Sequence, residues 1–166
     1  MVRQLDDFLQ EWTYESQSTL NLFKLIPDEL LALKEHEMIR SMGKLCWHIT
    51  ITLSEMLNRT GLSVIGPAEE SETPQHMQEI IDAYQTSSQS MLENIKASWN
   101  NETLNDDVDM YGQVWKKGTV LDVLIKHQAH HRGQLTVLMR VAGLKVPGVY
   151  GPSKEEWSEF GMPEME

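Results

Sequence analysis

The sequence predicts an all-α fold: a four-helix bundle with a short C-terminal helix, formed by a single domain over residues 1–166. Four long segments carry apolar residues at intervals of three and four, as the buried face of a helix requires. Turn residues separate these segments. The chain is long enough for one hydrophobic core, and it shows no internal repeat or long linker that would mark a second domain.

The first expected helix begins near Leu5 and continues to Ile26, because apolar residues recur along it at helical spacing, apart from a polar middle. Pro27 ends it, since proline inside a helix removes a backbone hydrogen bond. Residues 28–33 are long enough for one short turn of helix. A second long segment follows them.

The second expected helix carries apolar residues from Met38 to Leu57 and stops before Gly61. Residues 47–53 are apolar on nearly all sides and contain several β-branched side chains, which leaves a local strand open as an alternative. The length of the whole segment favours a helix.

The third expected helix begins at Thr73 and Pro74, which pair an N-cap hydroxyl with a proline at the first helical position. Its apolar stripe continues to about Trp99. Residues 100–109 are rich in Asn and Asp, so we expect an irregular connection there.

The fourth expected helix begins at Thr119, because Thr119 and Asp122 form a capping-box pattern. It continues to Ala142, with Gly143 in the position that glycine favours after a helix end. In the tail, Ser153 and Glu156 repeat the capping-box pattern, which predicts the short C-terminal helix.

The composition disfavours several classes of protein. With 25 Asp and Glu against 14 Lys and Arg, the net charge is −11, which repels a phosphate backbone and disfavours nucleic-acid binding. Cys46 is the single cysteine, so no internal disulfide forms, in keeping with a reducing compartment. The first residues do not resemble a signal peptide, and no apolar run approaches the roughly 18 residues that span a bilayer. We therefore expect a cytoplasmic protein without a membrane partner.

Three histidines form the candidate metal site. His127 and His131 are four residues apart in the fourth expected helix, so both imidazoles lie on one face and can reach one metal ion. His48, in the apolar second helix, is the candidate third ligand. Taken singly, His48 also fits a hydrogen-bonded core histidine, and the pair also fits a solvated face. The three together favour a metal.

The other histidines and their neighbours are expected elsewhere. His130 is rotated by about 100° from His131 along the helix, which places it at the rim of the site or behind the ligands. The same position is expected for Arg132 and Gln134. Cys46 is expected to fill the core, since it points to a different helix face from His48. Two further histidines lie among polar residues and are expected at the surface: His36 and His76.

Three neutral imidazoles leave a divalent ion with its full charge and an open position, where water or a thiol becomes a nucleophile near neutral pH. Zinc and nickel are the metals that we expect. Because the ligands must be neutral, metal release is expected as the pH falls toward about 6. Glu55 is a candidate general base, although a solvated helix-end carboxylate is the more common role at such a position. Tyr111 and Trp115 fit either a pocket wall or ordinary core filling.

The segments that carry these histidines resemble the DinB family of bacterial damage-inducible and related proteins, which is distinct from the lesion-bypass polymerase of the same name. The resemblance is carried by residues 124–135 (LIKHQAHHRGQL), by the sequence LCWH that ends at His48, and by residues 142–152 (AGLKVPGVYGP). It implies a four-helix bundle, commonly dimeric, with a divalent metal on three histidines. These correspond to His48, His127 and His131. Relatives in the wider superfamily include transferases and isomerases that use bacillithiol or mycothiol, and many members have no known activity.

Two functions are expected from different classes. The first is a divalent-metal-dependent enzyme, a thiol transferase or a hydrolase, that uses the three-histidine site to activate a small thiol or water. Its partners would be a small-molecule substrate, such as a low-molecular-weight thiol, and a second copy in a homodimer. The second is a non-catalytic metal-binding stress protein in which the ion ties two helices together.

Overall fold

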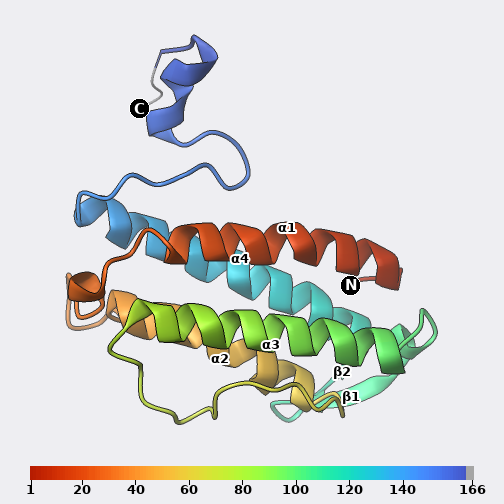
Figure 1. Cartoon of the computed structure of the whole chain (residues 1–166). Helices are drawn as coiled ribbons and strands as arrows, with labels where there is room; N and C mark the ends of the chain where they lie inside the picture. Colours follow the sequence, from red (N-terminus) through yellow and green to blue (C-terminus); the bar gives the residue numbers. More distant parts are fainter. Residues whose placement is uncertain (164–166) are drawn as a thin grey trace.

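The computed structural model describes residues 1–163 and contains a four-helix bundle (Figure 1). The long helices are α1 (Leu5–Phe23), α2 (Met42–Asn58), α3 (Met77–Ser98) and α4 (Lys117–Val141). Three short 3-10 helices accompany them: η1 (Asp28–Leu30), η2 (Thr103–Asn105) and η3 (Lys154–Phe160). Strands β1 (Asp107–Met110) and β2 (Gln113–Lys116) form one antiparallel hairpin. The predicted all-α bundle is confirmed, with this small hairpin as an addition.

The four helices form a ring in which α2 and α4 are neighbours. α1 and α2 each pack against both α3 and α4, so α1 and α2 lie diagonally opposite each other. The segment 59–76 runs back along the bundle, so that α2 and α3 point the same way and α4 runs antiparallel to α2 (Figure 1). This places the middle of α2 beside the middle of α4.

The core lies between the four helices and consists of large apolar side chains. Burying one such side chain fully contributes about 1.5–3 kcal/mol, so these residues supply the main driving force for the bundle. The largest fully buried ones include Phe8, Trp12 and Leu22 of α1, Leu53 and Leu57 of α2, and Ile80 and Met91 of α3.

Residues 47–53 are helical, so the local strand alternative is wrong. α2 is buried on most of its circumference, because it contacts both α3 and α4 and is covered by the loop that follows it. The hydroxyls of Thr50 and Thr52 donate hydrogen bonds to the backbone oxygens of Cys46 and Ile49. These local bonds satisfy the two buried hydroxyls within the helix.

α3 begins at Met77 and not at Thr73, which corrects the predicted start. The cap comes from another element: Asp28 accepts the backbone N–H of Met77 through Oδ1 at 2.7 Å. The other oxygen, Oδ2, lies 2.9 Å from Nδ1 of His76. A carboxylate supplied by η1 therefore satisfies the helix end that Thr73 was expected to cap.

α4 begins at Lys117 and not at Thr119, and no side-chain cap is present at its start. Residues 100–109 were expected to be irregular, but η2 and β1 occupy part of them. The hairpin feeds directly into α4. A Cβ on Gly118 would lie 2.4 Å from the backbone oxygen of Val2, so glycine permits the close approach of the N-terminal segment.

The remaining boundaries agree more closely with expectation. α1 ends at Phe23, a few residues before the expected end at Ile26. α2 begins at Met42, where the Ser41 hydroxyl accepts the backbone N–H of Lys44. The capping box at Ser153 is present at the start of η3, in the tail that leaves the bundle beyond α4 (Figure 1). Within residues 1–163, no helix is both long enough and apolar enough to cross a membrane.

Candidate metal centre

The three predicted histidines meet between α2 and α4. Nε2 of His127 lies 3.1 Å from Nε2 of His48 and 3.1 Å from Nε2 of His131. One ring nitrogen from each histidine lies within 4.8 Å of those of the other two. His131 is buried, and the other two are partly buried. The antiparallel packing of α2 on α4 therefore brings together residues separated by 79 positions in the chain.

This arrangement fits a divalent ion. A tetrahedral ion with bonds of 2.0–2.1 Å to imidazole holds its ligand atoms about 3.3 Å apart, close to the separations of the Nε2 atoms. All three ligands are neutral nitrogen donors, which suit zinc and nickel. Three such donors leave one tetrahedral position free, as in catalytic sites.

Gln134 sets the tautomer of one ligand. Its Oε1 lies 2.9 Å from Nδ1 of His131, and its Nε2 lies 3.1 Å from Nε2 of His130. Because an amide oxygen only accepts, the proton of His131 is on Nδ1, and the lone pair of Nε2 points toward the other histidines. A hydrogen bond to the rear nitrogen is the usual way in which proteins orient a histidine ligand.

Burial lowers the pKa of all three imidazoles. The pKa of His48 falls to about 4, chiefly through burial, with smaller effects from Arg40 and His131. The pKa of His127 falls to about 3 for the same main reason, with added repulsion from the other histidines and Arg40. Burial also lowers the pKa of His131, against the opposing effect of Gln134. The rings are therefore neutral at pH 7, as metal ligands must be.

A cavity of about 360 Å³ adjoins the histidines. It lies between α2, α4 and the hairpin and is lined by His48, Ile51, Thr52, Glu55, Met56, Glu69, Tyr111, Trp115, Val123 and His127. Two of the three histidines thus face a space that is large enough for a small molecule. Tyr111 and Trp115, which the sequence left as either pocket wall or core filling, both line this cavity.

Glu55 is held at this cavity and is not a solvated carboxylate, because its side chain is only 11% exposed. Its Oε1 accepts a hydrogen bond from Nε of Arg59 at 2.7 Å, and its Oε2 accepts one from the Tyr111 hydroxyl at 2.9 Å. Burial, and then the contact with Glu55, raise the pKa of Tyr111 to about 12. The phenol therefore keeps its proton and donates to Glu55 at neutral pH.

The hairpin turn carries Tyr111 to this position at a conformational cost. Tyr111 and Gly112 form the two-residue turn and have positive φ angles of 59° and 78°. Positive φ is unfavourable for a bulky residue, and Asn usually occupies the first position of such turns. The Tyr111 side chain packs against Trp115, with ring centroids 6.3 Å apart.

The structure also places the remaining histidines and the cysteine where the sequence predicts them. His130 is exposed beside Gln134, as expected for a rim residue. His36 and His76 are exposed, and Cys46 is buried in the core.

Arg132 was expected at the rim of the site or behind the ligands, and this expectation is wrong. Its side chain is 2% exposed and forms an ion pair with Glu15 of α1. A signal for this pair is present in the sequence, because Glu15 falls on the apolar stripe of α1 between Trp12 and Thr19. A charged residue on a buried helix face needs a partner of opposite charge.

The chain is similar to known proteins over nearly its whole length. The family model described as the DinB family matches residues 1–165. An uncharacterized protein, YrdA from Bacillus subtilis (strain 168), is 39% identical over 162 residues, which is 98% of this chain and 97% of that protein.

Solved structures show the same architecture. A DinB-like protein from Bacillus cereus ATCC 10987 is 36% identical, with a TM-score of 0.86 over 90% of this chain and 100% of that chain. A DinB-like protein from Bacillus subtilis, YjoA, is 18% identical, with a TM-score of 0.69 over 86% of this chain and 97% of that chain. The second likeness concerns the fold alone.

Proposed function

The chain belongs to the DinB family, and on that basis and the geometry of its histidines we propose that it is a metal-dependent enzyme. In this proposal His48, His127 and His131 bind one divalent ion, zinc or nickel, and the site activates a small thiol or water. The reaction class is thiol transfer or hydrolysis.

One observation carries the proposal: three neutral, partly or fully buried imidazoles converge beside a cavity. A site that only ties helices together needs no adjoining space for a small molecule. Here His48 and His127 both line the cavity of about 360 Å³. This juxtaposition favours the enzyme over the non-catalytic stress protein with a structural ion.

The residues around the histidines have separate tasks in the proposed reaction. When bound, a divalent ion with an open position lowers the pKa of a water or thiol and so supplies a nucleophile near neutral pH. Gln134 holds the ring of His131 in the tautomer that directs Nε2 inward. Glu55 lines the same cavity as His48 and His127, and its carboxylate accepts the proton that the nucleophile releases. Tyr111 orients that carboxylate by donating to Oε2.

Metal binding is tested by the melting temperature, Tm, at pH 7.5 with zinc or nickel added and with a chelator. A ligand that binds only the folded state stabilises it by about 2.7 kcal/mol at a hundredfold excess over the dissociation constant, so Tm rises by several degrees. His127→Ala abolishes this rise. His36→Ala, the same change at an exposed histidine, preserves it. Metal binding is refuted if neither metal nor chelator moves the melting curve of the wild type.

Catalysis is tested with the metal-loaded protein on a panel of electrophiles with bacillithiol, coenzyme A or glutathione, and on esters. We expect turnover that His127→Ala abolishes and that Glu55→Gln reduces by about 10²-fold or more, the contribution of a general base. Absence of turnover with every thiol and ester, in a protein that binds metal, would favour the structural-ion alternative. Light scattering on the same sample tests the proposed homodimer.

A further inference from the structure

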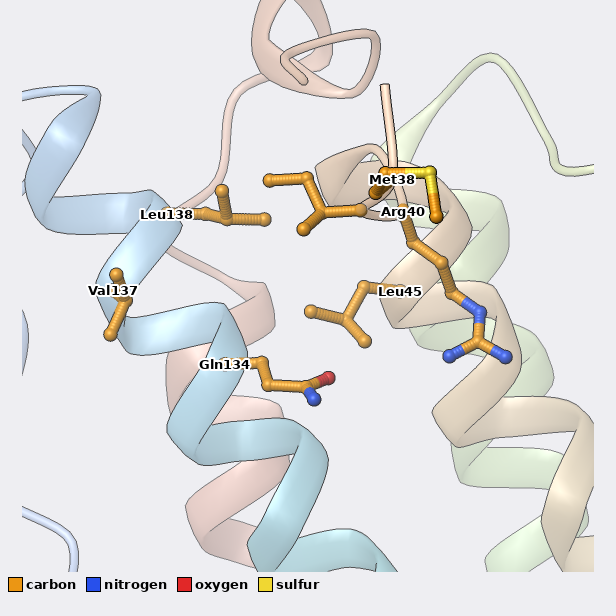
Figure 2. A pocket seen from close by; sticks show the side chains of 7 residues that line it. Met38, Arg40, Leu45, Gln134, Val137 and Leu138 are labelled. Carbon is orange, nitrogen blue, oxygen red and sulfur yellow. The ribbon is translucent and has the colours of Figure 1, made fainter. Parts of the chain in front are cut away.

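A second cavity lies in the groove between α2 and α4, on the other side of the histidines. Its volume is about 550 Å³, within the usual range for small-molecule sites. Its lining comes from the segment before α2, from α2 and from the last turns of α4: Met38, Ile39, Arg40, Leu45, Gln134, Val137 and Leu138. Figure 2 shows Leu138 and Gln134 of α4 extending toward Leu45 of α2 across the groove.

This cavity begins one helical turn from the metal centre. Leu45 precedes His48 by three residues on α2, and Gln134 follows His131 by three residues on α4. Gln134 is in direct contact with His131 through its Oε1. The cavity that contains Glu55 lies in the opposite direction along α2. The histidines therefore lie between two cavities of different character.

The lining is mainly apolar, and part of it is open to solvent. Met38 is 82% exposed and Val137 is 61% exposed. Large apolar side chains gathered at the rim of a cavity mark a surface that binds an apolar group. Leu45 and Leu138 are buried and form the inner wall.

Arg40 is the single charged residue of the lining. None of the ion pairs formed within residues 1–163 involves Arg40, although the chain carries a net charge of −11. Figure 2 shows its guanidinium beside α2, across the groove from Gln134 of α4. Arg40 lines the same cavity as Gln134, the residue that contacts His131.

Arg40 is exposed and has no acidic partner within residues 1–163, so its guanidinium is free to pair with an anion that enters the cavity. Guanidinium presents two parallel N–H donors, which match the two oxygens of a carboxylate. The single positive charge of the lining also matches the single negative charge of a carboxylate. The polar end of the cavity is thus complementary to a carboxylate, and the rest of it to a hydrocarbon.

We propose that this cavity binds a small amphipathic carboxylate, with its apolar body against Leu45, Val137 and Leu138 and its carboxylate paired with Arg40. The inference deepens the proposed function, on which it rests, because it names the substrate class of the same centre. The bound molecule has its polar end toward the histidines. Its carboxylate then lies beside Gln134, which contacts His131, on the side of the metal centre opposite Glu55.

The test compares octanoate with its neutral analogue octanamide by isothermal titration calorimetry, in the presence and absence of zinc. The wild type is expected to bind octanoate at least tenfold more tightly than octanamide. Arg40→Gln reduces octanoate binding to the level of octanamide, because only the ion pair is lost. Arg3→Gln, the same substitution at the far end of the bundle, leaves the tenfold preference unchanged.

A second variant tests the location. Val137→Trp fills the cavity from an exposed position, so it weakens octanoate and octanamide together without disturbing the core. In nuclear magnetic resonance spectra of the wild type, octanoate is expected to shift the backbone amides of residues 38–40 and 134–138. The inference is overturned if octanoate binds equally to the wild type and to Arg40→Gln, if Val137→Trp has no effect, or if octanoate does not bind.

Zinc binding by wild type and Arg40→Gln is measured separately, so the two proposals fail in different ways. Zinc binding without octanoate binding refutes this inference alone. Octanoate binding without zinc binding refutes the metal site alone. If Val137→Trp instead changes the mass measured by light scattering and octanoate does not bind, the surface is an interface between copies and the inference is refuted.

Discussion

The protonation of individual histidines decides what the metal centre can do. His48 and His127 have pKa values lowered to about 4 and about 3, chiefly by burial. An ordinary histidine, with a pKa near 6.5, begins to release a metal as the pH falls toward 6. In the folded chain, protons compete for these two ligands only at lower pH. The expected pH of metal release therefore moves below 6.

The same lowered pKa values predict how the stability of the metal-free protein depends on pH. Well above pH 6.5 both histidines are neutral in the folded and unfolded states, so they do not affect the free energy of unfolding. Between pH 6.5 and about 4 the unfolded chain binds protons that the folded chain does not, which favours unfolding. The Tm measured with a chelator should thus fall between pH 7.5 and pH 5.

His76 requires a control in this experiment, because contact with Asp28 raises its pKa and gives a contribution of opposite sign. The measurement is therefore made in a His76→Gln background. Adding His48→Gln and His127→Gln should weaken the dependence of Tm on pH, with the part due to His131 remaining, while adding His36→Gln should leave it unchanged. A Tm that stays constant or rises as the pH falls would contradict the lowered pKa values.

Among the elements, the hairpin has the clearest link to the site. β1 and β2 pair in register from Asp107 opposite Lys116 to Met110 opposite Gln113, which leaves Tyr111 and Gly112 as the turn. This register carries the Tyr111 side chain to the Glu55 carboxylate. The guanidinium of Arg59 lies 4.8 Å from the centre of the Tyr111 ring and covers it. The hairpin thus forms one wall of the cavity that adjoins the histidines.

Comparison of Tyr111→Asn with Tyr111→Ala separates the turn from the side chain. Both variants lose the phenol, but Asn tolerates a positive φ better than Ala does. Tyr111→Asn should therefore be more stable than Tyr111→Ala by up to about 1 kcal/mol in urea unfolding. Both should lose the same activity in the proposed reaction, since each removes the donor to Glu55. Equal stability of the two variants would exclude a conformational cost at this turn.

In the molecule as a whole, a polar network joins α1, α4 and the C-terminal tail, with Arg132 and Glu15 buried and Tyr150 exposed. Arg132 donates to Glu15 and to the Thr19 hydroxyl inside the bundle. The hydroxyl of Tyr150, in the tail, contacts both Arg132 and Glu15. Arg132 is also the residue after His131, so this network holds the helix that carries two of the three ligands.

Removing the charge of Glu15 while Arg132 remains should destabilise the whole fold. Glu15→Gln leaves a buried guanidinium without a counter-charge, which costs about 3–5 kcal/mol of unfolding free energy. Replacing both partners, Glu15→Leu with Arg132→Met, should cost less, because no uncompensated charge remains. Lys126→Gln, which removes a salt bridge of an exposed lysine with Asp122, should change stability by less than about 1 kcal/mol. Urea unfolding measures these free energies, and a Glu15→Gln variant as stable as the wild type would contradict the predicted cost of the unpaired Arg132.

Prediction from the sequence succeeded where the signal lies within one segment. The apolar periodicity of residues 5–26 and 38–57 predicts two helices, which the structure places at residues 5–23 and 42–58. The capping box at Ser153 predicts the start of η3. The four-residue spacing of His127 and His131 places both on one helix face. These features follow from the 3.6-residue repeat of a helix, which depends only on neighbouring positions.

The amino-acid sequence by itself determined the four-helix class and the pair of histidines on α4. Only the tertiary structure decided that Asp28 caps a helix 49 residues away, that Glu15 neutralises Arg132 from 117 residues away, and that Arg40 faces a cavity. The physical reason is that such contacts depend on how helices pack and loops return, which distance along the chain does not record.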